Sequence, residues 1–413
     1  MSMRVQAPRG ILLGLVLLAA GVRAQEITER ELIQRFVTLS PYVRELTAGV
    51  AVTKAETSGW SLWPNPAAGY TREGAGLTEF IQYEQALPVS GRLRQLRQAG
   101  SAVIGAAQSQ ADFTRWELIS EIRSAFYGLV TAQERETVVR ANLERLDEIL
   151  KILRIREKEG EGSVYDRLRA ERERSEIETE VSAIRISTAQ ARSRLAAFFP
   201  RGAIAESLSA KGSLASFQPI PTSEALLARA LDARGDYKAE RQQIASFEYR
   251  RQAAGRLRIP EPSVAAGLKR ADIGPGMANG GFVSVSVPLP LFNRGETEVA
   301  RFQAETERAQ ARRQAIEQRI GAEVDAARKT LELRRVVLSD YQLRVEEQGR
   351  QLEQIARTAY QEGEIGILEL LDAYRMNLNS RLRSLEFTSV AKQAEIDLER
   401  VVGAPVLNQE VLP

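Results

Sequence analysis

The sequence has no cysteine and no histidine among its 413 residues, and only four methionines. Without cysteine the chain cannot form a disulfide, a thiolate metal site or a lipid-modified N-terminal cysteine. Without histidine, Ser-His-Asp and Cys-His catalysis are excluded, and soft metal ions lack their usual ligands. We therefore expect no enzyme, no cofactor and no resident metal site.

Long hydrophobic runs are also scarce. Arg4 and Arg9 precede the short apolar run 11–20, and Val22-Arg23-Ala24 resembles a cleavage site, so residues 1–24 are expected to be a cleaved secretory signal peptide. No later stretch reaches the roughly 18 apolar residues of a transmembrane helix. Removing the three arginines of this signal leaves 54 basic residues against 54 acidic ones. A neutral mature chain argues against nucleic acid as a partner.

Proline is absent from two long windows, between Pro88 and Pro200 and between Pro290 and Pro405. Because proline breaks helices, its absence favours long helices there. Apolar residues within the windows recur at spacings of three and four, which is typical of a coiled-coil seam. These positions are Val139, Leu143, Leu146, Leu150 and Leu153, and then Ile320, Val324, Ala327 and Leu331.

Each window is interrupted once by glycine, at 160–163 and at 362–366. Glycine permits a tight reversal, and an apolar seam resumes after each reversal, so each window predicts an αα-hairpin. The resumed seams are Ile177, Val181 and Ile184, and Leu378, Leu382 and Leu385. The first arm, 91–159, would be about 100 Å long at the α-helical rise.

The apolar period changes to two just before each window. Valine and serine alternate over 282–287, and a less regular alternation runs over 81–87. Weaker partner strands precede them at 67–72 and 263–270. The sequence therefore predicts two β-hairpins.

The two halves of the chain resemble each other. Leu87-Pro88 recurs as Leu289-Pro290, and Glu159-Gly160-Glu161 recurs as Glu362-Gly363-Glu364, at offsets of 202 and 203 residues. This indicates an internal duplication. The prolines before each hairpin recur at the smaller offset of 196 residues, so the second hairpin carries extra residues, which we expect in a loop over 272–280.

These patterns divide the chain into eight expected segments. They are a signal peptide (1–24), an N-terminal equatorial helix (25–59), a first β-hairpin (60–90), a first long αα-hairpin (91–200), a linker with an equatorial helix (201–259), a second β-hairpin (260–291), a second long αα-hairpin (292–404) and a C-terminal tail (405–413). Four strands cannot close a barrel, and a bilayer does not tolerate open strand edges. We therefore expect copies of the chain to pool their strands.

This order of elements resembles the TolC family of outer-membrane efflux proteins. The strings at 288–295 and 363–375 resemble its cobalt-zinc-cadmium, or CzcC-like, heavy-metal subgroup. The resemblance implies an α+β membrane protein with a trimeric 12-stranded β-barrel, four strands from each protomer, continued by a long α-helical coiled-coil periplasmic tunnel. It also implies the outer membrane of a Gram-negative bacterium. The implied partners are two further copies in a homotrimer, outer-membrane lipid, a periplasmic adaptor and an inner-membrane RND-type pump.

The resemblance places a constriction at the two helical turns. Glu369 and Asp372 match its inward-facing acidic positions, although ordinary solvated helix charges are the alternative. Tyr360 and Asp166 match two participants in a closing hydrogen bond, with an ordinary packed aromatic residue at a helix end as the alternative for Tyr360. An arginine expected two residues after the turn glycine is Ile365 here, so part of this closing network is missing or replaced by apolar contact.

Two further groups of residues are candidates for contacts outside the chain. Small residues at the turns would let an adaptor approach, with simple turn formation as the alternative: Gly160, Gly162, Gly363 and Gly366. Aromatic residues beside the strands suit a membrane-interface girdle, with core packing as the alternative: Trp60, Trp63 and Phe292.

The function expected from this sequence is a passive exit duct, for heavy-metal cations delivered by the pump and adaptor. A TolC-type duct for drugs, solvents or type I secretion would share the fold and stays open as an alternative. A periplasmic adaptor or a structural coiled-coil protein is the alternative of another class, but both lack duplicated β-hairpins.

Overall fold

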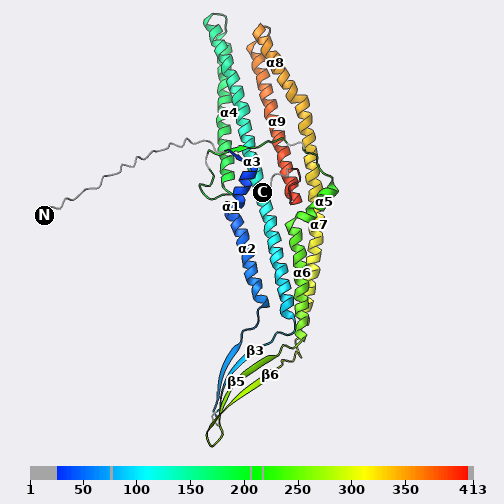
Figure 1. Ribbon diagram of the computed structural model, residues 1–413. Helices are drawn as coiled ribbons and strands as arrows, with labels where there is room; N and C mark the ends of the chain where they lie inside the picture. Colours follow the sequence, from blue (N-terminus) through cyan, green and yellow to red (C-terminus); the bar gives the residue numbers. More distant parts are fainter. Residues whose placement is uncertain (1–25, 75–77, 205–206, 216–217, 408–413) are drawn as a thin grey trace, which may run out of the picture.

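The computed structural model describes residues 26–74, 78–204, 207–215 and 218–407. The expected signal peptide lies outside these residues. The molecule is a long rod with a β-sheet at one end and two helical tips at the other (Figure 1). We call the middle of the rod, where residues 26–39, 209–211 and 223–234 lie, the waist. Within the described ranges, no helix combines the length and the apolar character needed to cross a membrane.

The first half of the chain contains one copy of the duplicated unit. Its elements are β1 (Glu26–Thr28), α1 (Glu29–Leu39), α2 (Pro41–Ser58), the 3₁₀ turn η1 (Gly59–Ser61), β2 (Ala67–Glu73), β3 (Thr78–Ala86), α3 (Arg92–Lys158) and α4 (Val164–Ala196). The sequence predicted one helix over 25–59, but there are two, because Ser40 ends α1 and its hydroxyl caps α2. Of these, α1 lies at the waist, whereas α2 runs beside α3 toward the sheet (Figure 1).

The second half repeats this plan. Its elements are β4 (Ser209–Lys211), α5 (Ser223–Ala233), α6 (Gly235–Gly255), the 3₁₀ turn η2 (Arg256–Arg258), β5 (Ser263–Asp272), β6 (Met277–Ser286), α7 (Glu296–Tyr341), the π-helical turn η3 (Gln342–Glu346), α8 (Glu347–Glu362) and α9 (Ile367–Val402). The sequence predicted a single interruption in this window, so the π turn is an addition. A parallel pairing of β1 with β4 joins the two halves at the waist and was not predicted.

The four long strands form one antiparallel sheet in the order β2-β3-β5-β6. The predicted loop over 272–280 is wrong, because β5 reaches Asp272 and β6 begins at Met277, leaving a turn of four residues. The extra residues of the second hairpin therefore lengthen its strands. Cross-strand register puts one set of apolar side chains on one face: Tyr70, Ile81, Tyr83, Leu268, Val283 and Val285. All of them are exposed in the single chain, by 54–74%.

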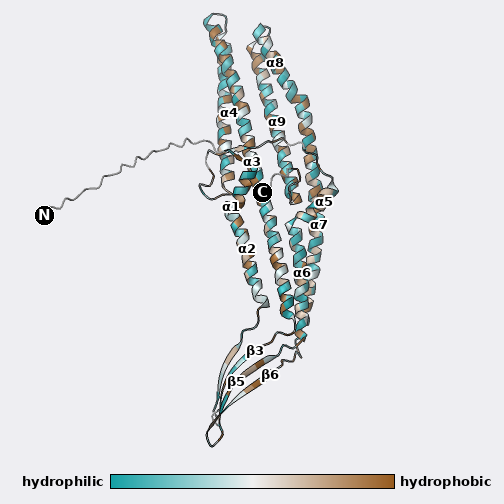
Figure 2. Cartoon of the chain, viewed as in Figure 1, coloured by the Kyte–Doolittle hydropathy of each residue, from teal (hydrophilic) through white to brown (hydrophobic). Residues whose placement is uncertain are grey.

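The long helices pack by the predicted seams. Helix α3 has 67 residues, which corresponds to about 100 Å. Most of the predicted seam residues are buried, and Leu143, Leu382 and Ala327 are partly buried beside them. Hydrophobic and hydrophilic residues alternate along every long helix (Figure 2), as expected where helices bury one stripe and leave the rest to solvent or another chain.

Candidate gate at the helical tips

The two hairpins reverse direction through the same type of turn. Gly160 and Gly363 adopt left-handed conformations, with φ of 78° and 79°. In the first turn the amide of Glu161 donates to the carbonyl of Arg156 over 2.9 Å, and the second turn contains an equivalent bond of the same length. Both positions need glycine because other residues pay a steric cost at positive φ.

The four turn glycines have different surroundings. A Cβ at Gly162 would lie 2.7 Å from the backbone nitrogen of Glu157, so the turn itself requires glycine there. A Cβ at Gly160 or Gly363 would meet no atom within 4 Å, and one at Gly366 would meet only a side-chain oxygen 3.1 Å away. Backbone crowding therefore explains Gly162, while the other three face open space or a movable side chain.

An apolar cluster joins the two hairpins just behind the turns. Tyr360, Leu370 and Tyr374 of the second hairpin belong to the same buried cluster as Leu146 and Leu150 of α3. Ile365, at the position where the sequence resemblance implied an arginine, is partly buried against this cluster. At residue 365 the chain therefore makes apolar contacts, where the sequence resemblance implied a polar contact by an arginine.

Tyr360 is a packed residue with charges of both signs nearby. It is only 8% exposed, and the guanidinium of Arg156 lies 5.5 Å from its ring centroid. Burial raises the pKa of Tyr360, while the charge of Arg156 lowers it and that of Asp166 raises it. The fold thus brings Asp166 near Tyr360, but the described residues of the chain contain no hydrogen bond between the two.

Glu369 and Asp372 lie on the exposed side of α9. Their neighbours Leu370 and Leu371 are buried, so the two carboxylates face away from the apolar cluster. Glu173 chiefly, and the charge of Asp372 to a smaller extent, raise the pKa of Arg375. Across the described ranges, no group of three or more acidic side chains could hold a metal ion.

Two polar bridges between the hairpins were not predicted. Arg375 of α9 donates through Nε to Glu173 of α4 over 3.2 Å. Arg145 of α3 pairs with Glu353 of α8 over 2.5 Å, and Asn377 also donates to this carboxylate. The carboxylates of Glu173 and Glu353 are only 12% and 13% exposed. The sequence did not predict these pairs, because no spacing rule identifies partners in separate hairpins.

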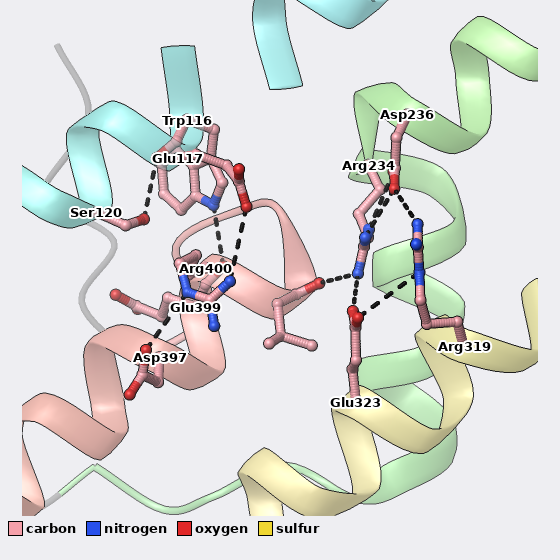
Figure 3. Close-up of polar contacts among 11 residues, drawn as sticks. Trp116, Glu117, Ser120, Arg234, Asp236, Arg319, Glu323, Asp397, Glu399 and Arg400 are labelled. Atoms are coloured by element: carbon pink, nitrogen blue, oxygen red, sulfur yellow. Dashed lines mark hydrogen bonds and ion pairs between the residues drawn. The ribbon is translucent and has the colours of Figure 1, made fainter. Parts of the chain in front are cut away.

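Polar networks fix the waist, below the tips (Figure 3). Arg234 pairs with Asp236 over 2.7 Å and with Glu323 over 2.5 Å, which ties the start of α6 to α7. The indole of Trp116 donates to the backbone carbonyl of Glu399 over 3.1 Å, which ties α3 to α9. The two halves of the chain are therefore held together at mid-length.

The most buried part of the waist is centred on Arg123. Its side chain is 2% exposed and pairs with Glu29 over 2.5 Å and with Glu399 over 2.7 Å. Burial alone would lower the pKa of Arg123, but the two carboxylates outweigh this and the net pKa is raised. Tyr127 donates to Glu29 over 2.6 Å, and burial followed by the charge of Glu29 raises the pKa of Tyr127. This network joins the N-terminal segment, α3 and α9.

The three candidate interface aromatics lie near the junction of sheet and helices, in different settings. Trp60 is half-buried, with the guanidinium of Arg250 only 4.1 Å from its ring. Trp63 is 61% exposed and Phe292 is fully exposed. Trp60 thus packs within the chain, whereas the other two point outward.

Comparisons with known proteins agree with this architecture. A protein-family model described as OEP, outer membrane efflux protein, matches residues 226–404. The chain is similar to the outer-membrane channel OprN, with 19% identity over 92% of this chain and 90% of that one, at a TM-score of 0.69. It is similar to the MtrE outer membrane channel of Neisseria gonorrhoeae, solved in its open state, with 17% identity over 93% and 91% and a TM-score of 0.69. It is also similar to the transmembrane channel CusC, with 16% identity over 91% of this chain and 92% of that one, at a TM-score of 0.66.

No curated protein matches the chain at a meaningful level. The expected fold class is nevertheless confirmed at the level of architecture. The chain has the α+β fold of the TolC-like outer-membrane channels.

Proposed function

We propose that the chain is a protomer of a trimeric, passive outer-membrane duct in a tripartite efflux system. The observation that carries this proposal is the four-stranded sheet, which has an exposed apolar face and two unpaired edge strands, β2 and β6, among the described residues. A bilayer tolerates strands only in a closed barrel, because open edges leave backbone groups unsatisfied. Three copies would supply twelve strands and close the edges.

The helices support the same arrangement. Many large apolar side chains of α7, η3 and α8 remain exposed in the single chain: Leu333, Val336, Val337, Leu343, Leu352 and Ile355. An apolar stripe of this length favours burial against other helices. In a trimer the α7–α8 arm of one protomer would pack on its neighbour, and six hairpins would surround a tunnel. The family match over 226–404 and the fold of the solved channels are consistent with a duct that carries out no chemical reaction.

We place the gate of this duct at the tips. Glu369 and Asp372 are exposed on α9 and face away from the packed cluster, so three copies could bring six carboxylates around the axis. Such rings favour cations over anions. Tyr360 and Asp166 are near each other and could form the closing contact between neighbouring hairpins. Heavy-metal cations are the proposed cargo, on the strength of the sequence strings that resemble the cobalt-zinc-cadmium subgroup.

The turns are the proposed docking site for a periplasmic adaptor, which would connect the duct to an inner-membrane RND-type pump. Gly160 and Gly363 have open space where a Cβ would lie, so another hairpin could approach their backbone closely. At the opposite end, exposed Trp63 and Phe292 suit contact with outer-membrane lipid at the periplasmic interface.

Two measurements test the proposal. The mature protein should fractionate with the outer membrane as a heat-resistant trimer, whereas a soluble periplasmic protein would fit the adaptor or structural alternatives. A deletion strain should become sensitive to zinc, cobalt, cadmium, nickel or copper salts. Unchanged metal tolerance with increased sensitivity to dyes and detergents would instead identify a duct for drugs or solvents.

A further inference from the structure

Three arginines gather where the helices meet the sheet. Arg92 at the start of α3, Arg250 near the end of α6 and Arg301 in the first turns of α7 line one cavity of about 610 Å³. Trp60 and Phe302 line it as well. Sites for small molecules typically have roughly 300–1,000 Å³, so the cavity is large enough for a ligand or a lipid head group.

None of the three guanidinium groups has an acidic partner in the described part of the chain. Arg250 is held by aromatic rings instead, 4.1 Å from the centroid of Trp60 and 5.9 Å from that of Phe302. Arg301 lies 5.2 Å from the Phe302 ring. Burial, and then the positive charge of Arg301, lowers the pKa of Arg250. Arginines that line one cavity and form no ion pair with a carboxylate are suited to bind the oxygens of a phosphate.

The same cavity also contains a carboxylate, Glu298, one of whose oxygens lacks a hydrogen-bond donor among the described residues. The Oε2 atom of Glu298 is shielded from solvent and accepts no hydrogen bond within the described ranges. The other acid of the cavity, Glu261, accepts a hydrogen bond from the hydroxyl of Ser90. A shielded carboxylate is stabilised by a hydrogen-bonding cation. The cavity therefore combines a site for an anion with a site for an ammonium group.

The position of the cavity indicates where such a zwitterion would come from. Pro64 and Pro88, which flank the first β-hairpin, form part of its wall. The segments beside the strands carry large apolar side chains that are 61–100% exposed: Leu62, Trp63, Val89, Leu289, Leu291 and Phe292. A collar of this kind at the end of membrane strands lies at the level of lipid head groups.

We propose that this cavity binds the head group of a phosphoethanolamine lipid, with Arg92, Arg250 and Arg301 around the phosphate and Glu298 accepting hydrogen bonds from the ammonium. The location of the lipid rests on the outer-membrane placement proposed above. The site would anchor the junction of sheet and helices to one leaflet, and no feature of the duct itself requires it.

Binding can be measured on the purified full-length trimer in detergent by native mass spectrometry. The probes are a short-chain phosphatidylethanolamine, the matching phosphatidylcholine, whose quaternary ammonium cannot donate a hydrogen bond, and inorganic phosphate. Arg250→Met should weaken both lipids by about tenfold or more, because a charge-assisted phosphate contact is lost. Glu298→Gln should reduce the preference for phosphatidylethanolamine and leave phosphatidylcholine binding unchanged.

Two additional variants make the result decisive. Arg301→Met removes a more exposed arginine of the same cavity and should weaken both lipids even if Arg250→Met fails to fold. Arg308→Met is the matched control, since Arg308 is on the same helix with a side chain 70% exposed, and its lipid binding should equal that of the wild type. Unchanged lipid affinity in Arg301→Met would overturn the site, as would inorganic phosphate binding as tightly as the lipid. A trimer that conducts ions yet shows no lipid preference would reject the lipid site alone, leaving the duct intact.

Discussion

Replacing Arg123 by methionine should destabilise the waist more than any substitution of a surface charge. The change removes a guanidinium that is 2% exposed and leaves the carboxylates of Glu29 and Glu399, which are 11% and 1% exposed. Breaking a buried ion pair by removing one partner costs about 3–5 kcal/mol, because an unpaired charge stays buried. The two acids retain some hydrogen bonds, from the Tyr127 hydroxyl and from the amide of Leu407, so we expect the lower part of this range.

This loss can be converted to a melting temperature. Unfolding entropy of about 2.1 cal/mol/K per residue gives about 0.9 kcal/mol/K for a chain of this length, so Arg123→Met should lower the midpoint by about 4 °C. The assay is thermal unfolding of the detergent-solubilised protein, followed by far-ultraviolet circular dichroism at a fixed protein concentration. Wild type and variant must be compared in the same detergent, since binding partners shift apparent stability.

Two more variants establish that the effect comes from buried charge. Arg172→Met removes an arginine whose side chain is 82% exposed in its pair with Glu176, and should leave the midpoint within about 1 °C. The double variant Arg123→Met with Glu399→Gln removes one of the two carboxylate charges that paired with Arg123, and it should be less destabilised than Arg123→Met alone. If Arg123→Met melts like the wild type, or the double variant is as unstable as the sum of its parts, the reasoning from uncompensated charge is refuted.

Four further outcomes are expected. Glu369→Gln with Asp372→Asn should lower cation selectivity in planar bilayers. Unaltered selectivity would show that these carboxylates have no part in selecting ions. Tyr360→Phe keeps the apolar packing and removes only the hydroxyl, so it and Asp166→Ala should both raise single-channel conductance. Conductance equal to that of the wild type in both variants would argue against a closing contact. Gly366→Ala should weaken adaptor binding while the turn persists, because the new methyl group meets only the movable end of the Glu369 side chain; unweakened binding would remove this turn from the docking site. Above pH 10, the ordinary pKa of tyrosine, the wild type should lose stability more steeply than Tyr127→Phe, because the raised pKa of Tyr127 means that only the unfolded chain ionises there; melting curves from pH 7 to 11 with identical slopes would contradict this.

The sequence predicts those parts of the fold that local patterns determine. The proline-free windows, the seam at Val139 to Leu153 and the glycine reversals all correspond to helices and turns of the structure. Strict alternation likewise located β6, although it started the strand five residues late, since residues 277–281 contain two glycines and little apolar character. In that stretch, pairing with β5 outweighs local propensity.

What the sequence does not predict depends on contacts between distant segments. The pairing of β1 with β4 involves three residues on each side and has no periodic signal. The bridges from Glu173 to Arg375 and from Arg145 to Glu353 each join helices of different hairpins, and their charges look like any solvated helix flank until the hairpins are placed side by side. The apolar role of Ile365 is visible only once the cluster around Tyr360 is assembled.

The network around Arg123 also bears on the order in which the chain can fold. Its partners come from residue 29 and residue 399, and the amide of Leu407 completes the hydrogen bonding of Glu399. In the outer-membrane duct proposed above, a chain delivered from its N-terminus cannot complete this network until residues 399–407 have emerged. Until then α3 can pack on α4 and α6 but not on α9, and contacts of such large sequence separation form slowly. The sequence positions of the partners of one arginine thus make the closing of the waist a late step in folding.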